Sequence, residues 1–205
     1  MIYLVRHGQS EWNLLRRTQG QTMHPRLTRA GREQAVAAGT AILADLDGRS
    51  VTRIVTSDLV RAVETAQLLA GALDAPVLPD GRLRERGLGT FQGLDTEQTF
   101  AAATTLDWSD PNLRVGGGES TREVSDRMVA ALADADAGAG RGAVTVVVSH
   151  GDAIRTALGA LAGYPPGAAP WLEVPNGAVL VLDADLPVRR LGQDAPLSWR
   201  RAGGG

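Results

Sequence analysis

The sequence predicts an α/β fold, a three-layer sandwich in which helices flank a mostly parallel central sheet. Apolar runs of strand length alternate along the chain with longer segments whose apolar residues recur at helical spacing. Three of the strand-like runs end at or just before basic residues, which are Arg6 with His7, Arg61, and His150. Ligands of open α/β sheets bind at the carboxyl ends of the strands. We therefore expect an anion-binding site where these three runs end.

The bulk composition is that of one globular domain. The 205 residues are 43% hydrophobic and 21% charged, which is ordinary for such a domain. A net charge of −2 gives no indication of nucleic acid or an anionic membrane as a partner. The chain has no cysteine, and hence no disulfide framework or thiolate metal site. We expect a single domain over residues 1–205, with a flexible tail at about 200–205.

The first elements follow from local patterns. Residues 2–5 form a short apolar run that predicts a buried strand. No charged leader with a long apolar segment is visible there, so the expected location is cytoplasmic. Residues 12–26 are polar and irregular, which predicts a loop. Thr28 is a suitable N-cap for a helix that runs to about Asp45, with apolar residues spaced for one buried face.

A second strand and helix come next. Residues 53–58 are strand-like, and residues 59–73 have the apolar spacing of a helix, with Asp58 as the expected N-cap. Arg61 falls in the first turn of this helix and can reach back toward the end of the strand. Residues 76–78 predict a further short strand.

The middle of the chain is the least regular part. Within residues 81–118 only a helix near 96–105 is predicted. Ser120 and Glu123 then have the spacing of a capping box, in which each side chain bonds the other residue's backbone. The helix behind them is expected to bury an apolar face made of Val124, Met128, Ala131, Leu132 and Ala135.

The last part carries the strongest strand signal. A glycine-rich turn at 138–142 leads into the apolar run 144–148, which is followed by a predicted helix at 153–161 and a strand at 178–182.

The pair Arg6 and His7 indicates chemistry rather than packing. Placing two such side chains at the end of a buried strand is costly for packing alone. Neutral imidazole is a competent nucleophile near pH 7, and the nearby cations Arg6 and Arg61 should favour the neutral form of His7. The pattern therefore favours an anion site that contains a nucleophile.

Four motifs in order resemble those of the histidine phosphatase superfamily, the group that contains the cofactor-dependent phosphoglycerate mutases and many related phosphatases. The matching motifs are Leu4-Val5-Arg6-His7-Gly8, Ser57-Asp58-Leu59-Val60-Arg61-Ala62 with Thr65-Ala66, Leu83-Arg84-Glu85, and Val148-Ser149-His150-Gly151. The match extends to about Asn176, nearly the whole chain, and implies a phosphoglycerate mutase-like fold.

The resemblance also implies a mechanism. His7 would be phosphorylated on a ring nitrogen and would then pass the phosphoryl group to water or another acceptor. Arg6, Arg61 and His150 would hold the phosphate. Glu85 would be the general acid that protonates the leaving alkoxide and then activates water. The substrate-binding residues implied in the same way are Asn13, Gln19, Gly20 and Gly151.

The expected partner is a small phosphorylated metabolite, with no metal and no other cofactor. Arginine and histidine neutralise charge here as magnesium does elsewhere, and the chain has no Gly-x-x-x-x-Gly-Lys loop. Neither nucleic acid nor a membrane is expected as a partner. An exposed strand edge could pair two copies into a homodimer, although nothing in the pattern requires it.

Metal-independent hydrolysis of a phosphomonoester is the favoured activity. A mutase must shield its phosphohistidine from water, and only residues 86–118 lie between Glu85 and the next helix start, which is short for such a cover. The alternatives are a cofactor-dependent phosphoglycerate mutase and a module that binds phosphorylated ligands with little turnover. Binding alone would need neither Glu85 nor a free imidazole.

The roles of Glu119 and Trp108 are left open by the sequence. Glu119 could support the site or could serve as charge at a helix N-terminus. Trp108 could line the pocket or cover the core. His24 is expected to be an exposed loop residue. Residues 21–28 depart from the family's pattern, which bears on the substrate rather than on the mechanism.

Overall fold

The fold is built on a six-stranded sheet in the order β3-β2-β4-β1-β5-β6. The computed structural model describes residues 1–137, 143–183 and 188–192. The strands are β1 (Ile2–Arg6), β2 (Val51–Thr56), β3 (Val77–Pro79), β4 (Val144–Ser149), β5 (Val179–Leu182) and β6 (Arg189–Arg190). The first four are parallel, β5 is antiparallel to β1, and β6 is antiparallel to β5. The prediction of a mostly parallel sheet is confirmed.

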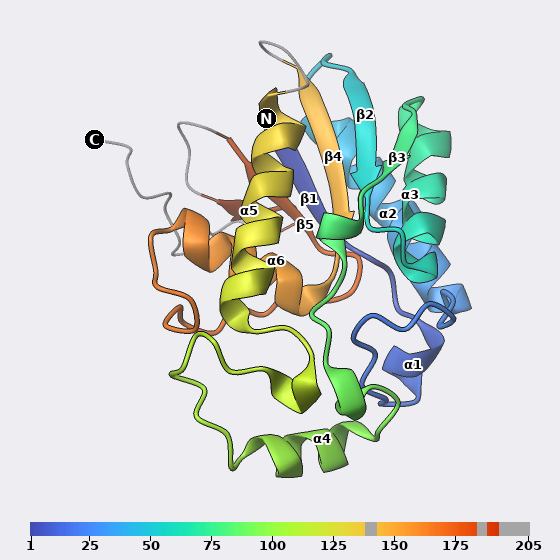
Figure 1. The fold of residues 1–205 in the computed structure, drawn as a ribbon. Helices are drawn as coiled ribbons and strands as arrows, with labels where there is room; N and C mark the ends of the chain where they lie inside the picture. Colours follow the sequence, from blue (N-terminus) through green and yellow to red (C-terminus); the bar gives the residue numbers. More distant parts are fainter. Residues whose placement is uncertain (138–142, 184–187, 193–205) are drawn as a thin grey trace.

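Helices cover both faces of this sheet (Figure 1). The helices and short 3-10 turns are α1 (Glu11–Leu14), α2 (Arg29–Asp45), α3 (Val60–Leu73), η1 (Gly81–Leu83), η2 (Gly89–Phe91), α4 (Thr96–Ala103), η3 (Val115–Gly117), α5 (Thr121–Ala137) and α6 (Gly151–Leu161). Helices α2 and α3 pack together on one face, whereas α5 and α6 pack together on the other. None of the helices in the described ranges is long and apolar enough to cross a membrane.

The alternation of side chains along β1 explains why two separate apolar cores exist. Ile2 and Leu4 belong to the cluster formed with α5 and α6, whereas Tyr3 and Val5 belong to the cluster formed with α2 and α3. Successive residues of a strand point to opposite faces, so a short, wholly apolar strand serves both cores. Burying each large apolar side chain contributes about 1.5–3 kcal/mol.

Two predicted helix starts are confirmed in detail. Thr28 is the N-cap of α2, and its hydroxyl accepts a hydrogen bond of 3.0 Å from the Gly31 amide. Before α5, the Ser120 hydroxyl accepts from the Glu123 amide at 3.2 Å, and the Ser120 amide donates to the Glu123 carboxylate at 2.9 Å. This reciprocal pair is the predicted capping box.

Two local predictions are wrong. Residues 12–26 are not all loop, because α1 forms one helical turn there, capped by Ser10. Asp58 does not cap α3: the N-cap is Leu59, without a side-chain hydrogen bond. The Asp58 carboxylate instead accepts two hydrogen bonds from the Arg84 guanidinium, at 2.6 and 2.5 Å. A two-point, charge-assisted contact outcompetes a single backbone amide. The predicted turn at 138–142 and tail at 200–205 lie outside the described residues.

The loop after β1 is fixed by two glycines that touch. A Cβ on Gly8 would lie 2.1 Å from the Gly31 carbonyl oxygen, and a Cβ on Gly31 would lie 2.0 Å from the Gln9 carbonyl oxygen. The loop therefore packs directly on the first turn of α2. This contact positions the residues at the carboxyl end of β1, where α1 and α4 also lie (Figure 1).

Candidate active site

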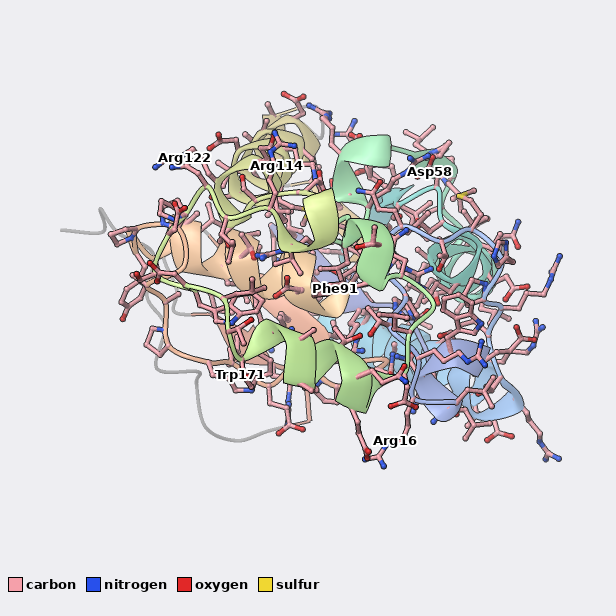
Figure 2. All side chains as sticks on the ribbon, turned by 60° about the horizontal axis from the view of Figure 1, so that its bottom comes forward. Arg16, Asp58, Phe91, Arg114, Arg122 and Trp171 are labelled. Atoms are coloured by element: carbon pink, nitrogen blue, oxygen red, sulfur yellow. The ribbon has the colours of Figure 1, made fainter. Side chains whose placement is uncertain are left out.

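A cavity of about 820 Å³ opens at the carboxyl edge of the parallel strands. Figure 2 looks onto this end of the molecule, where α4 and the labelled Trp171 are both seen. The inner part of the cavity is lined by Arg6, His7, Asn13, Gln19, Gly20, Arg61 and Glu85. Its outer walls include Phe100, Trp108 and Trp171. Most of the predicted site residues are therefore brought together in one cavity.

His7 is buried and has its tautomer set by a backbone contact. Its Nδ1 lies 2.7 Å from the Gly8 carbonyl oxygen. A carbonyl can only accept, so Nδ1 carries the proton and donates it, which leaves the lone pair on Nε2. Burial, followed by the charges of Arg61 and Arg6, holds the pKa of His7 well below 6.5. The imidazole is therefore neutral at pH 7, with a free lone pair on Nε2.

Arg61 is fully buried and is held by backbone oxygens rather than by a carboxylate. Its guanidinium donates to the carbonyls of Gly20 at 2.8 Å and Thr22 at 2.9 Å. Within the described ranges it has no ion pair, and its Nε has no hydrogen-bond partner. Burial lowers the pKa of Arg61 to about 10, so the side chain stays cationic at pH 7. A buried cation without a counter-ion is the signature of an anion site.

Arg6 is placed beside the first turn of α6. Its guanidinium donates to the Val174 carbonyl at 2.5 Å. A Cβ on Gly151 would lie 3.2 Å from the Arg6 guanidinium, so glycine allows this close contact. Gly151, predicted to bind substrate, is buried behind Arg6 and is not among the residues that line the cavity.

His150 lies next to His7, with the ring centroids 5.0 Å apart. Its Nε2 is 2.8 Å from the Ser57 hydroxyl, and its buried Nδ1 has no partner among the described residues. Burial, followed by the charge of Arg61, holds the pKa of His150 well below 6.5. Like Gly151, His150 is fully buried and does not itself line the cavity.

Asn13 and Gln19 line the cavity, and the oxygen of each side-chain amide already accepts hydrogen bonds from protein groups. The Asn13 oxygen accepts from the Ser10 amide at 3.0 Å and from the Asn176 side chain at 3.3 Å. The Gln19 oxygen lies 2.8 Å from the Ser10 hydroxyl. Their NH₂ groups donate to no residue of the described ranges, which leaves two donors for a ligand. Gly20 has a φ of +49°, and its carbonyl orients Arg61.

Glu85 is held at the N-terminus of α6. Its carboxylate accepts hydrogen bonds from the Ala153 amide at 2.9 Å and the Arg86 amide at 3.0 Å, with a longer one from Asp152 at 3.3 Å. These contacts fix the orientation of a carboxyl group that lines the cavity together with His7.

A pair formed by Arg127 and Glu119 holds the segment that carries Glu85. The Arg127 guanidinium donates to the carbonyls of Arg82 and Arg84, both at 2.6 Å, and of Glu85 at 3.0 Å. Glu119 pairs with Arg127 at 2.8 Å and accepts from the Gly87 amide at 2.7 Å. These contacts favour the first of the two roles considered for Glu119, which is to support the segment that carries Glu85. The helix N-terminus is capped by Ser120 instead.

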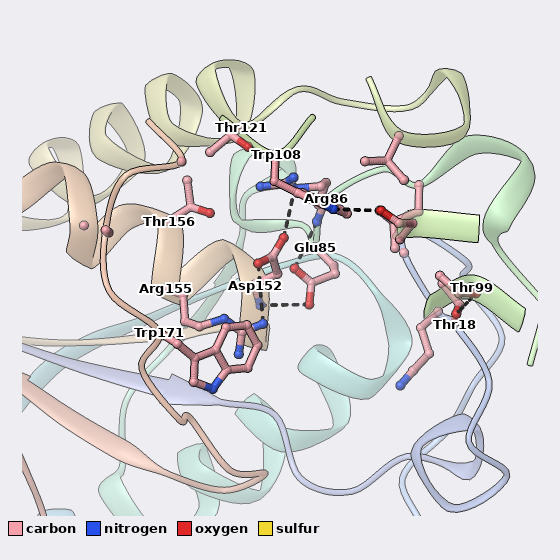
Figure 3. Close-up of a pocket in the computed structure, with 18 of the residues that line it drawn as sticks. Thr18, Glu85, Arg86, Thr99, Trp108, Thr121, Asp152, Arg155, Thr156 and Trp171 are labelled. Atoms are coloured by element: carbon pink, nitrogen blue, oxygen red, sulfur yellow. Dashed lines mark hydrogen bonds and ion pairs between the residues drawn. The ribbon is translucent and has the colours of Figure 1, made fainter. Parts of the chain in front are cut away.

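The sequence analysis did not predict several residues that line the cavity. Among them are Arg86, Asp152, Arg155 and Trp171 (Figure 3). Arg86 pairs with Asp152 at 2.9 Å, and the Arg155 guanidinium lies 4.0 Å from the centre of the Trp171 ring. The only sequence signals were proximity to Glu85 for Arg86 and to His150 for Asp152 and Arg155. Nothing in the sequence connects residue 171 with this site.

Trp108, whose role was left open, lines the cavity, and His24 is exposed as predicted. The indole N–H of Trp108 donates to the Ala103 carbonyl at 2.9 Å. His24 meets Trp12 edge-on, with the ring centroids 6.1 Å apart. The described residues contain no group of three or more histidine, aspartate or glutamate side chains that could hold a metal ion.

Comparison with known proteins agrees with this geometry. The family model of the histidine phosphatase superfamily (branch 1) matches residues 2–191. The chain belongs to the histidine phosphatase superfamily. The predicted family and fold are thereby confirmed.

Relatives within the superfamily carry different names. A probable phosphoglycerate mutase GpmB of Salmonella choleraesuis is 35% identical over 186 residues, which cover 89% of this chain and 84% of that protein. The structure of a mycobacterial glucosyl-3-phosphoglycerate phosphatase is 34% identical, covers 87% of this chain and 88% of that one, and superposes with a TM-score of 0.75. A phosphoserine phosphatase from Entamoeba histolytica, in complex with 3-phosphoglyceric acid, is 28% identical and covers 87% and 88%, with a TM-score of 0.73. Phosphatases and mutase-like proteins are thus both neighbours of this chain.

Proposed function

We propose that this chain hydrolyses a small phosphomonoester, without a metal ion, through a phosphohistidine at His7. The observation that carries the proposal is the hydrogen bond from His7 Nδ1 to the Gly8 carbonyl. This bond leaves a neutral Nε2 lone pair in a cavity that also contains the cations Arg6 and Arg61. A nucleophile that needs no deprotonation is thereby combined with a place for the phosphate charge.

The first half-reaction transfers the phosphoryl group to the protein. His7 Nε2 attacks phosphorus, the ester P–O bond breaks, and its electron pair leaves with the alkoxide. Glu85, in its protonated form, gives the alkoxide its proton. Arg6 and Arg61 balance the charge on the phosphoryl oxygens, and oriented donors of this kind contribute about 3 kcal/mol each to the transition state.

The second half-reaction returns the protein to its starting state. A water molecule attacks the phosphohistidine, its proton passes to the Glu85 carboxylate, and the P–N bond breaks with its electron pair returning to Nε2. The NH₂ groups of Asn13 and Gln19 supply further contacts to the phosphoryl oxygens, and the buried His150 packs against His7. Inorganic phosphate then leaves.

A second candidate is phosphoglycerate mutase activity, which the name of the 35% identical relative favours. A mutase would return the phosphoryl group from His7 to a bound intermediate and would have to exclude water. Here the segment between Glu85 and α5 is short and forms one wall of the cavity through α4 and Trp108. A site open enough to admit water supports hydrolysis over transfer.

The test is phosphate release in EDTA from phosphoglycerates, sugar phosphates and nucleoside monophosphates. We expect release by the native chain to survive EDTA and to fall at least a thousandfold in His7→Ala, with His24→Ala as the matched control. Interconversion of 2- and 3-phosphoglycerate with little free phosphate would establish the mutase instead. Binding of these esters without turnover of either kind would establish a binding module. Activity that EDTA abolishes and a divalent cation restores would refute the metal-independent mechanism.

A further inference from the structure

The cavity carries more positive charge than a phosphate group needs. Five arginines and two carboxylates line it. A phosphomonoester carries a charge of about −1.5 to −2 at pH 7. Arg17 is exposed and screened by solvent, and Glu85 is protonated in the proposed first half-reaction. The other four arginines then face only Asp152 and the phosphate, which leaves about one positive charge without a partner. The remaining question is which arginine holds that charge.

Arg155 is the arginine that best fits. Arg6 and Arg61 flank His7, and Arg86 is paired with Asp152 at 2.9 Å. Among the described residues, the polar partner of the Arg155 side chain is Asp152, at a long 3.4 Å, and the other oxygen of that carboxylate pairs with Arg86. Arg17 also lines the cavity, but its side chain is exposed, so water and salt screen it.

The orientation of Arg155 is set by Trp171. The guanidinium lies over the indole ring at 4.0 Å from its centre, and only 20% of the Arg155 side chain is exposed. Stacking uses the face of the guanidinium plane and leaves its N–H groups, which lie in that plane, to contact a ligand. Trp171 is itself 76% exposed, so burial of its own surface does not explain its position in the cavity wall.

Arg155 lies where the alcohol portion of a substrate would bind, rather than where the phosphate would bind. Figure 3 shows Arg155 and Trp171 beside Asp152 and Glu85. Glu85 is the residue that would protonate the leaving oxygen, so a group next to Glu85 faces what that oxygen carries. Arg155 is also close enough to Arg6 for its charge to lower the pKa of Arg6, although burial is the larger cause.

We propose that Arg155, oriented by Trp171, determines specificity by binding a carboxylate on the alcohol portion of the substrate. This inference rests on the proposed hydrolysis and narrows its substrate class to phosphorylated hydroxy acids. A carboxylate on the guanidinium fork would neutralise the remaining charge through charge-assisted hydrogen bonds. The cavity is large enough for such an acid to carry a further substituent against the aromatic walls.

The test compares two substrates that differ in one group. 3-Phosphoglycerate has a carboxylate where glycerol 3-phosphate has a hydroxymethyl group. The readout is the ratio of kcat/KM for the first to kcat/KM for the second. We expect Arg155→Met to lower this ratio about tenfold to a hundredfold and Arg155→Lys, which keeps the charge, to restore part of it. The matched control is Arg29→Met, which removes an exposed arginine on α2 that pairs with Glu33.

A change in the ratio of the two kcat/KM values distinguishes lost binding of the carboxylate from general damage to the site, which would lower both values equally. Trp171→Ala should lower the same ratio by a smaller factor, because Arg155 loses its orientation but not its charge. An Arg155→Met variant in which both kcat/KM values fall equally, or neither falls, would overturn the proposal. A thermal melt of each variant shows whether it is folded. If Arg155→Met is misfolded, the ratio of kcat/KM values in Arg155→Lys is compared with that of the native chain.

Failure of the proposed hydrolysis would be distinguishable from failure of this inference. If the native chain releases phosphate from neither ester, calorimetric titration with each ester replaces kinetics. Tighter binding of 3-phosphoglycerate by the native chain, with that preference lost in Arg155→Met, would support the carboxylate site without turnover. Equal binding of both esters by the native chain would refute it.

Discussion

At the scale of single residues, the site depends on which nitrogen of His7 holds its proton. The Gly8 carbonyl accepts a hydrogen bond from Nδ1–H, which keeps the first proton on Nδ1, and burial disfavours a second proton on Nε2. The sequence predicted that His7 would lie at the end of a buried strand and that nearby cations would favour its neutral form. It could not predict that burial is the larger cause or which nitrogen is free, because both depend on how the loop turns back on itself.

Glu85→Gln tests the general acid. Glutamine keeps the size of the side chain but cannot supply a proton, so we expect kcat to fall by about 10²–10⁴ for alkyl phosphates. The loss should be much smaller for p-nitrophenyl phosphate, whose leaving group needs no proton. Steady-state kinetics on both esters measure the difference, with the exposed Glu33→Gln as control. An equal loss on both would indicate that Glu85 only positions other groups.

Sequence reasoning failed at residues whose partners lie far away in the chain. Asp58 has a good position for a helix cap, yet it contacts Arg84. Arg127 lies in the middle of a predicted helix and contacts carbonyls at 82–85. Trp171 lies in a loop and contacts Arg155. Local patterns indicate what a residue can do, whereas the tertiary fold decides between partners.

At the scale of elements, the two touching glycines connect helix α2 to the loop that bears His7. Gly31→Ala would place a Cβ 2.0 Å from the Gln9 carbonyl oxygen, so the backbone would have to move. We expect a loss of about 2 kcal/mol or more in unfolding free energy, within the range for overpacking. The matched control is Gly71→Ala in α3, where a Cβ meets nothing within 4 Å.

For Gly71→Ala we expect a gain of about 0.5–1 kcal/mol, because alanine restricts the unfolded chain and favours the helix. Urea unfolding of both variants measures the contrast. Equal effects of the two substitutions would show that the contact between Gly8 and Gly31 does not constrain the loop.

Helix α5 has a similar role for the segment around Glu85. Arg127→Met removes three hydrogen bonds to backbone carbonyls and the ion pair with Glu119, whose carboxylate keeps the hydrogen bond from the Gly87 amide. We expect a loss of about 2–4 kcal/mol in unfolding free energy, because a partly buried ion pair is broken from one side.

The comparison for Arg127→Met is Arg122→Met on the same helix, since Arg122 is exposed and its side chain donates a hydrogen bond to Asn112 rather than to the backbone around Glu85. This control should cost about 0.5 kcal/mol or less. Comparable losses in the two variants would contradict the supporting role of Arg127.

Elements with strong local patterns were predictable, and short or irregular ones were not. The apolar run of β4 and the capped starts of α2 and α5 follow directly from the sequence. Helix α1 is a single turn of four residues, too short to show helical spacing, and its capping by Ser10 depends on the packing of the surrounding loop. For the cavity wall, the sequence predicted a helix near α4. It left the role of Trp108 open, because that role also depends on how the surrounding loop packs.

At the scale of the whole molecule, two buried neutral histidines couple stability to pH. Both His7 and His150 have a pKa well below 6.5 in the folded protein, chiefly because of burial. The unfolded chain takes up these protons near pH 6.5 and the folded protein does not, so stability is full above pH 6.5 and falls as the pH drops below it. The expected slope is about 1.4 kcal/mol per pH unit for each histidine.

Urea unfolding between pH 5 and 7 checks this slope in a range where carboxylates do not titrate appreciably. His150→Asn should remove about half of the pH dependence, whatever its effect at pH 7. An unchanged slope in this variant would show that His150 is protonated in the folded protein.

The overall architecture was the most predictable feature, because three strands that end in basic residues can share an edge in few ways. Structure and comparison agree on the superfamily and its fold. The pairing of two copies into a homodimer stays a prediction, and among the described strands β3 and β6 are the sheet edges that could serve it. Analytical ultracentrifugation would measure the oligomeric state.

The most direct test of the central claim is to trap the phosphorylated intermediate. Native chain turning over a phosphomonoester would be quenched in alkali, where phosphohistidine survives, and mapped by mass spectrometry and ³¹P NMR. We predict phosphate on Nε2 of His7, at up to one equivalent per chain, and none in His7→Ala. Phosphate on Nδ1 or on another residue, or rapid release with no phosphoenzyme at any quench time, would contradict the account.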